Sequence, residues 1–135
     1  MSQGSRKLYR ISASSLRIVD KISTGAAPDG VAVGAGAVWV ANTGSDSVMR
    51  IDLHSRAKVR IPVPDGPSKV AVRGNSVWVT CVERDRLARI DARTRRVVGH
   101  SLSLPGDPFA LAVGPGDVWV TLLSRARVVR VAYRH

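Results

Sequence analysis

The stretch Ala37–Asn42, with the sequence AVWVAN, decides the fold because its central Val-Trp-Val triplet occurs three times in the chain. The chain has 135 residues and three tryptophans, and each tryptophan lies at the centre of one such triplet. Trp39, Trp78 and Trp119 are separated by 39 and 41 residues. A nearly constant interval of this length indicates a repeated structural unit of about 40 residues.

Two further residue types keep the same interval. Pro28, Pro67 and Pro108 are also 39 and 41 residues apart. An arginine series adds a position upstream, and its members are Arg10, Arg50, Arg89 and Arg130. We therefore expect an N-terminal tail at 1–7, followed by repeat units at 8–24 (partial), 25–64, 65–104 and 105–135 (without its outer strand).

Each repeat reads as a series of short strands. Apolar runs rich in valine alternate with glycine, proline, asparagine and aspartate, which is the pattern of β-strands separated by turns. The first complete repeat contains four such runs, at residues 30–34, 37–41, 47–52 and 58–63. Four antiparallel strands in about 40 residues are typical of a β-propeller blade. The sequence therefore predicts an all-β fold made of propeller blades.

The turns between these strands have recognisable chemistry. Glycines at 34–36, 73–75 and 114–116 predict tight hairpins that use positive φ angles. Asp52 stands three residues before Ser55, and Asp91 holds the same position in the next repeat. This spacing predicts hydrogen bonds from the backbone to the aspartate side chain across the turn.

The two ends of the chain fall inside blades. Residues 8–11 and 17–22 match the third and fourth strands of a blade, whereas the last repeat stops after its third strand. Residues 17–22 are one candidate for the missing outer strand. Because unpaired sheet edges tend to pair with other strands, we expect an incomplete or half propeller that self-associates or pairs with further propeller blades. A fragment of a longer propeller, a head-to-tail dimer and an open arc all satisfy this constraint.

Composition limits the remaining possibilities. Hydrophobic residues make up 44% of the chain, which is enough for a packed core. The single cysteine, Cys81, excludes an internal disulfide and is expected to be a small buried residue. No stretch is long and apolar enough to predict a membrane span, and residues 1–10 lack the apolar segment of a signal peptide. A cytoplasmic location is the default expectation.

The chain is strongly basic, with 21 Lys and Arg against 10 Asp and Glu and a net charge of +11. A basic stripe across two neighbouring blades, formed by Arg84, Arg86, Arg125 and Arg127, is one hypothesis and would allow nucleic-acid contact. A solvated, basic blade rim is the alternative. Aromatic residues do not alternate with these arginines, which removes the stacking platform of single-strand binders.

Three strings of the first complete repeat carry a family resemblance: Gly30–Gly34, Ala37–Asn42 and Val48–Asp52. They resemble the blades of bacterial propellers of the YVTN and streptogramin lyase-like (virginiamycin B lyase-like) superfamily, over residues 8–133. The resemblance implies the propeller fold but not one activity. Members include a metal-dependent lyase that opens cyclic antibiotics, nucleic-acid binders, and sensor or scaffold modules.

Propellers generally bind ligands on the face formed by two sets of loops, those that enter the innermost strand and those that link the second and third strands. The candidates on this face are Asp29, Asn42, Asp46, Lys69, Glu83, Arg84, Asp107 and Ser124. A lyase of the resembling family would place a histidine base and carboxylates around a divalent cation there. His54, His100 and His135 fall elsewhere in the repeats.

We therefore assign no catalytic or metal-binding residue and expect no cofactor, apart from a divalent cation if the chain is lyase-like. The sequence favours a non-catalytic binding or scaffold module, with a small molecule or protein of unknown identity as its ligand. A lyase-like enzyme or its remnant, and a nucleic-acid-binding propeller with an Arg-rich face, are the two alternatives. No membrane partner is expected.

Overall fold

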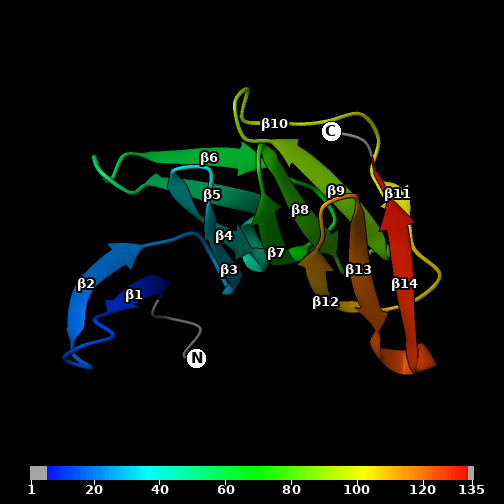
Figure 1. Ribbon diagram of the computed structural model, residues 1–135, viewed down its shortest axis with the longest axis horizontal. Coiled ribbons are helices and arrows are strands. Elements are labelled where there is room, and N and C mark those ends of the chain that lie inside the picture. Colours follow the sequence, from blue (N-terminus) through cyan, green and yellow to red (C-terminus); the bar gives the residue numbers. More distant parts are fainter. Residues whose placement is uncertain (1–5, 134–135) are drawn as a thin grey trace.

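The computed structural model describes residues 6–133, which form four antiparallel β-sheets (Figure 1). These residues contain no α-helix, only two short 3₁₀ turns at Thr43–Ser45 and Leu123–Arg125. Most of the expected tail at 1–7, and His135, lie outside the described residues. In the described part of the chain, no helix has the length and apolar character needed to cross a membrane. The predicted all-β class is confirmed.

The sheets follow one another along the chain, and we name them as blades. The partial blade contains β1 (Lys7–Ile11) and β2 (Ile18–Ser23). The first full blade contains β3 (Pro28–Gly34), β4 (Ala37–Asn42), β5 (Ser47–Asp52) and β6 (Lys58–Pro62). The second full blade contains β7 (Pro67–Arg73), β8 (Ser76–Cys81), β9 (Arg86–Asp91), β10 (Arg96–Val97) and β11 (Leu102–Ser103). The last blade contains β12 (Pro108–Val113), β13 (Asp117–Leu122) and β14 (Arg127–Ala132).

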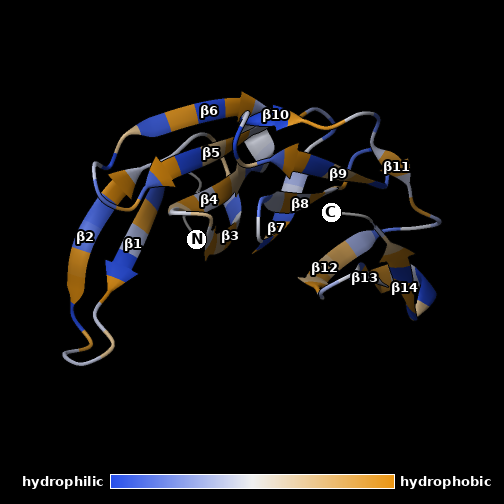
Figure 2. Ribbon diagram, turned by 45° about the horizontal axis from the view of Figure 1, so that its top comes forward, coloured by the Kyte–Doolittle hydropathy of each residue, from blue (hydrophilic) through white to orange (hydrophobic). Residues whose placement is uncertain are grey.

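The blades are arranged along an arc (Figure 2). The first strands β3, β7 and β12 lie on its concave side, and the outer strands β2, β6, β10 and β11 lie on its convex side. Neighbouring blades pack through their inner strands, since β7 contacts both β3 and β12. This is the arrangement of consecutive blades around part of a propeller ring, which confirms the expected incomplete propeller.

The repeated tryptophan and arginine are cross-strand neighbours. Trp39 on β4 pairs with Ala32 on β3 and with Arg50 on β5. Trp78 and Trp119 have the corresponding alanine and arginine neighbours in the next two blades. The guanidinium carbons of Arg50, Arg89 and Arg130 lie 5.8, 5.2 and 5.8 Å from the ring centroids of these tryptophans. Three members of the arginine series found in the sequence, Arg50, Arg89 and Arg130, are thus cation–π partners of the tryptophans.

Burial of the tryptophans changes from one end of the arc to the other. Trp39 is fully buried in a cluster with Val77, Val79 and Ile90 of the following blade. Trp78 is 6% exposed and packs against Val118 and Val120 of the last blade. Trp119, in the last blade, is 44% exposed. The same repeat position is therefore buried where another blade packs against it and exposed where, among residues 6–133, no blade does.

The predicted aspartate turns are present. The backbone amides of His54 and Ser55 donate to Asp52 Oδ1 at 2.8 and 2.9 Å, and the amides of Arg93 and Thr94 donate to Asp91 in the same way. These hydrogen bonds hold the pKa of both carboxyl groups below the ordinary range.

The hairpin glycines behave as predicted in two blades of three. Gly36 and Gly74 have φ of +73° and +58°. The prediction was wrong for the third hairpin, where neither Gly114 nor Gly116 has a positive φ. Pro115, whose ring fixes its own φ near −65°, lies between them and shapes this turn differently.

The two ends of the arc do not close on each other. Within the described residues, β2 pairs with β1 and with no other strand, and β14 pairs with β13 alone. The interpretation in which residues 17–22 complete the last blade was therefore wrong. Ile22 instead packs against Val40 and Ile51 of the first full blade.

The gradient of tryptophan burial yields a matched pair of substitutions. Trp39→Ala should lower the free energy of unfolding by about 3–5 kcal/mol, because it removes a fully buried aromatic side chain between two blades. Trp119→Ala should cost much less, since a large part of that ring already contacts solvent. Urea denaturation at micromolar protein concentration measures both values. Equal losses would contradict the account of blade packing.

Candidate functional site

The predicted ligand face contains one polar cluster that joins two blades. Lys69 Nζ on β7 lies 2.8 Å from Asp29 Oδ1 on β3, and Ser68 Oγ donates to Asp29 Oδ2 at 2.6 Å. Lys69 also lies 5.6 Å from the ring centroid of Phe109 on β12. The inner strands of three blades are thus connected on the concave side of the arc (Figure 2).

The electrostatics of Asp29 reflect this cluster. Partial burial on its own raises the pKa of Asp29, while hydrogen bonds from Lys69 and Ser68 and the charge of Lys69 lower it. The lowering effects outweigh burial, so the pKa lies below the ordinary value of 3.8. Asp29 is therefore an ionised partner of Lys69 at neutral pH and is poorly suited to act as a general acid.

Two of the other candidates support loops. Asn42 is fully buried, and its Oδ1 accepts a hydrogen bond from the Gly25 amide at 3.1 Å. Asp46 Oδ1 accepts one from the Gly66 amide at 3.0 Å. Both side chains hold the connections that enter a first strand.

The remaining candidates lie in the second full blade and the last blade. Glu83 lies beside Gly66, and Arg84 Nε lies 3.3 Å from Asp65 Oδ1. Asp107 contributes its backbone carbonyl, which accepts a hydrogen bond from the Leu123 amide. Ser124 lines an open hollow of about 330 Å³ together with two arginines.

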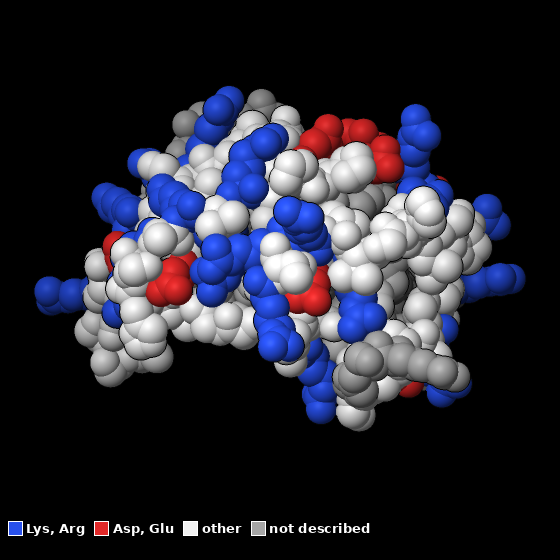
Figure 3. All heavy atoms as spheres, turned by 90° about the horizontal axis from the view of Figure 1, so that it is seen from above, with Lys and Arg blue, Asp and Glu red and all other residues white. Residues whose placement is uncertain are grey.

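The four arginines of the predicted stripe have different surroundings. Arg125 and Arg127 are the arginines beside Ser124 in that hollow. Arg86 is turned to the outer strand, where its guanidinium donates to the hydroxyl and carbonyl oxygens of Ser101. On the face shown in Figure 3, Lys and Arg side chains are distributed widely, with Asp and Glu side chains between them.

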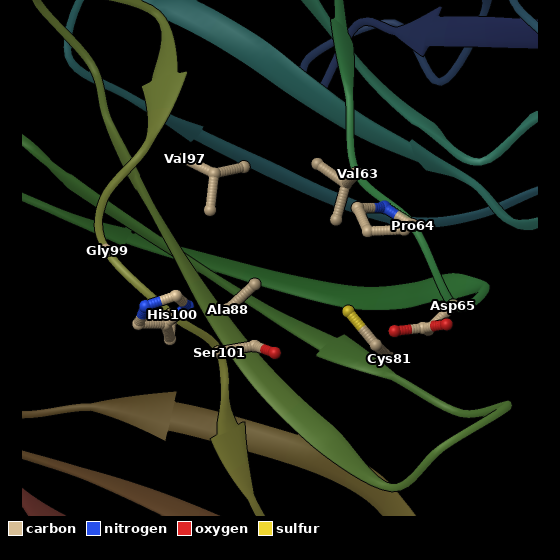
Figure 4. A pocket seen from close by; sticks show the side chains of 9 residues that line it. All are labelled: Val63, Pro64, Asp65, Cys81, Ala88, Val97, Gly99, His100 and Ser101. Atoms are coloured by element: carbon tan, nitrogen blue, oxygen red, sulfur yellow. The ribbon is translucent and has the colours of Figure 1, made fainter.

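Sequence reasoning missed a pocket between the first and second full blades. It has a volume of about 160 Å³ and is lined by Val63, Pro64, Asp65, Cys81, Ala88, Val97, Gly99, His100 and Ser101 (Figure 4). One signal of it was available in the sequence. The segment from Asp91 to Pro108 is two residues longer than the corresponding segment from Asp52 to Pro67.

Cys81 is buried, as expected, and its sulfur points into this pocket (Figure 4). Burial raises the pKa of the thiol to about 12, and the negative charge of Asp65 adds to the effect. The thiol is therefore protonated and a poor nucleophile at neutral pH. Within residues 6–133, no three side chains of the metal-binding types gather around a common point.

Comparison with known proteins shows the fold. The chain resembles virginiamycin B lyase from Staphylococcus aureus with a TM-score of 0.76 and 18% identity, over 98% of this chain and 50% of the lyase. It resembles a functionally unknown protein from Desulfotomaculum acetoxidans with a TM-score of 0.84 and 14% identity, over 98% and 45% of the two chains.

A third similar structure is a catalytically inactive histidine-to-alanine variant of the S. aureus lyase with quinupristin, with a TM-score of 0.70, 15% identity and coverage of 98% and 50%. No family profile and no curated protein matches the chain. The chain spans about half the length of these structural neighbours. The resemblance to virginiamycin B lyase-like propellers, expected from the sequence, is thus confirmed for the fold.

The Asp29 cluster predicts a measurable change in titration. Lys69→Met should raise the pKa of Asp29, because it removes one hydrogen bond and the neighbouring positive charge. In the wild type, the stabilisation from this depressed pKa is present above 3.8 and is lost as the pH falls through the lower, folded-state value. NMR titration of the Asp29 carboxyl carbon measures the shift. Lys58→Met, an exposed position on β6, is the control, and an unchanged Asp29 titration in Lys69→Met would contradict the cluster.

Proposed function

We propose that this chain is a non-catalytic β-propeller binding or scaffold module whose open ends pair with further propeller blades. The observation that carries the proposal is the exposure of Trp119. At the two preceding repeat positions, Trp39 and Trp78 are buried by the next blade. Trp119, at the same repeat position, is 44% exposed.

The surface around Trp119 is apolar and continuous. We call it the Trp119 face, and it consists of Ala110, Leu111, Ala112, Trp119, Thr121 and Val128, which line a shallow hollow of about 180 Å³. In the described part of the chain, the last blade has three strands, and no strand pairs with the outer edge of β14. An apolar face beside an open strand edge is a typical site of sheet pairing and protein association.

The opposite end of the arc is also partly open. Val31 and Val33 on β3 are 52% and 65% exposed, although Val70 at the corresponding position of the second full blade is 8% exposed. The partial blade covers only the outer half of this end, through Leu8 and Ile22. The missing part corresponds to the first two strands of a blade.

The number of strands favours further propeller blades over a second copy as the partner. A head-to-tail contact between two copies would bring the three strands β12–β14 together with the two strands β1–β2. A blade holds four strands, so β1 or β14 would have to be displaced. A chain that supplies an outer strand after β14 and two inner strands before β1 fits without displacement.

The arrangement of reactive side chains favours binding over catalysis. His54 lies in the hairpin after β5, at the end of the strands opposite to the ligand face, and His100 lies between β10 and β11. A lyase neighbour loses catalysis when one histidine is replaced by alanine. On the ligand face of this chain, the carboxylate of Asp29 is paired with Lys69. The lyase alternative therefore has less support than the binding module.

Association through the Trp119 face can be tested on the purified chain. We expect a solution mass above the 14.5 kDa of one chain, because the exposed face will pair with strands of another copy when no better partner is present. Trp119→Asp should restore the mass of the monomer, since a buried, unpaired carboxylate opposes docking. Light scattering across a range of concentrations measures both masses.

Leu53→Asp is the matched control. Leu53 is 45% exposed in the hairpin between β5 and β6 of the first full blade, at neither end of the arc, so this substitution should leave the mass of the wild type unchanged. A wild-type chain that stays a well-folded monomer at all concentrations would overturn the proposed association.

A further inference from the structure

The pocket between the first and second full blades originates in a break of the outer strand. In the first full blade, β6 is one continuous strand, whereas in the second full blade β10 ends at Val97 and β11 begins at Leu102. The pairing with β9 shifts by two residues across this break, since Val97 pairs with Ile90 and Leu102 pairs with Leu87. Two additional residues therefore leave the sheet and form one wall of the pocket.

This wall is held in place by specific contacts. The Val98 amide donates to the Arg89 carbonyl at 2.7 Å, and Gly99 turns the chain with a φ of +59°. The Arg86 guanidinium donates to both the hydroxyl and the carbonyl oxygen of Ser101. The wall is thus anchored on each side of Gly99 and does not collapse onto β9.

The floor of the pocket exists because two side chains are small. Ala88 pairs with Val79 on β8, and the corresponding residue of the first full blade is Met49. Cys81 occupies the repeat position of Leu122, which is buried in the last blade. Smaller side chains at both positions leave open the space that their repeat equivalents would occupy.

The lining contains apolar and polar side chains, with His100 and Ser101 on one side of Cys81 and Asp65 on the other (Figure 4). Val63, Pro64, Ala88 and Val97 provide aliphatic walls, and the protonated thiol of Cys81 adds a weakly polar surface. Asp65, His100 and Ser101 provide the polar atoms. The volume of about 160 Å³ is close to that of an engineered cavity of about 150 Å³ that binds benzene.

Negative charges outnumber positive ones around the Cys81 thiol, because Asp65, Asp46 and Glu83 act on it against Arg86, whose guanidinium is bonded to Ser101. The carboxylate of Asp65 lies 3.3 Å from Arg84, and the side chain of Arg84 is 76% exposed and well solvated. A second cation on the pocket side of this carboxylate would meet less competition from water. The pocket therefore matches a ligand with one apolar ring or short aliphatic body and one amino group.

We propose that this pocket binds a small apolar amine, with the apolar body between Val63, Ala88 and Val97 and the ammonium group beside Asp65. The proposal is independent of the ring-face residues and of the Trp119 face, because neither contributes to the lining. Binding is non-covalent, and Cys81 serves only as part of the floor.

The test uses two probes that share one ring, benzylamine and toluene, titrated into the isotope-labelled full chain and followed by amide NMR shifts. We expect saturable shifts at Ala88, Gly99 and Ser101 with both probes, and tighter binding of benzylamine. Asp65→Asn should raise the Kd of benzylamine about tenfold and leave that of toluene unchanged. Asparagine tolerates the left-handed backbone of Asp65, which has a φ of +69°.

Asp85→Asn is the matched control, because Asp85 also has a positive φ of +53° in the same blade and does not line the pocket. Ala88→Met should abolish binding of both probes, because methionine, the residue at the corresponding position 49 of the first full blade, would fill the pocket. If this variant does not fold, Cys81→Leu can be used instead. Leucine is the residue at the corresponding position 122 of the last blade, and it would fill the pocket from the same side. An unchanged melting temperature shows that the variant used is folded.

Three results would overturn the proposal. The absence of saturable shifts with either probe would show that the pocket is not a ligand site. Binding that persists in the folded Ala88→Met or Cys81→Leu chain would place the probes elsewhere. Equal Kd values of benzylamine for wild type and Asp65→Asn would show that Asp65 does not bind the ammonium group, which contradicts the proposed amine ligand.

Discussion

Packing of each blade against the next, through a tryptophan at one repeat position, is the constraint on which the rest of the structure depends. A four-stranded blade has two apolar faces, and neither can be buried within the blade itself. Trp39 and Trp78 fill the spaces between consecutive blades, whereas no further blade packs against Trp119 within residues 6–133. Stability in such a structure is a sum over neighbours, so the ends are its weakest and most interactive parts.

The same constraint accounts for part of the unusual charge. Arg50, Arg89 and Arg130 lie over the tryptophan rings, where their side chains cover apolar surface. The Arg50 side chain is 12% exposed, whereas that of Arg130, in the last blade, is 62% exposed. Arg86 is used to anchor the outer strand of its blade. A net charge of +11 therefore does not by itself identify a nucleic-acid surface, because several of the arginines have structural partners.

Departures from the repeat create the features that distinguish one blade from another. Asp29, Ser68 and Lys69 form a polar connection between two inner strands, and Phe109 extends it to the third. Two additional residues after Val97 open the pocket beside Cys81. The repeated residues form the blades, whereas the polar cluster and the pocket arise at positions where the repeats differ.

The sequence by itself determined the period, the strands, the aspartate turns and the incomplete blades at the two ends, because these follow from local patterns of two to six residues repeated along the chain. Only the tertiary structure decided which tryptophan is exposed, that within the described residues β2 pairs with β1 and not with β14, and that Lys69 forms an ion pair with Asp29. The pocket beside Cys81 was also visible only in the tertiary structure. Burial and side-chain partners depend on which blade lies next in space, and a repeat motif carries no information about its neighbour.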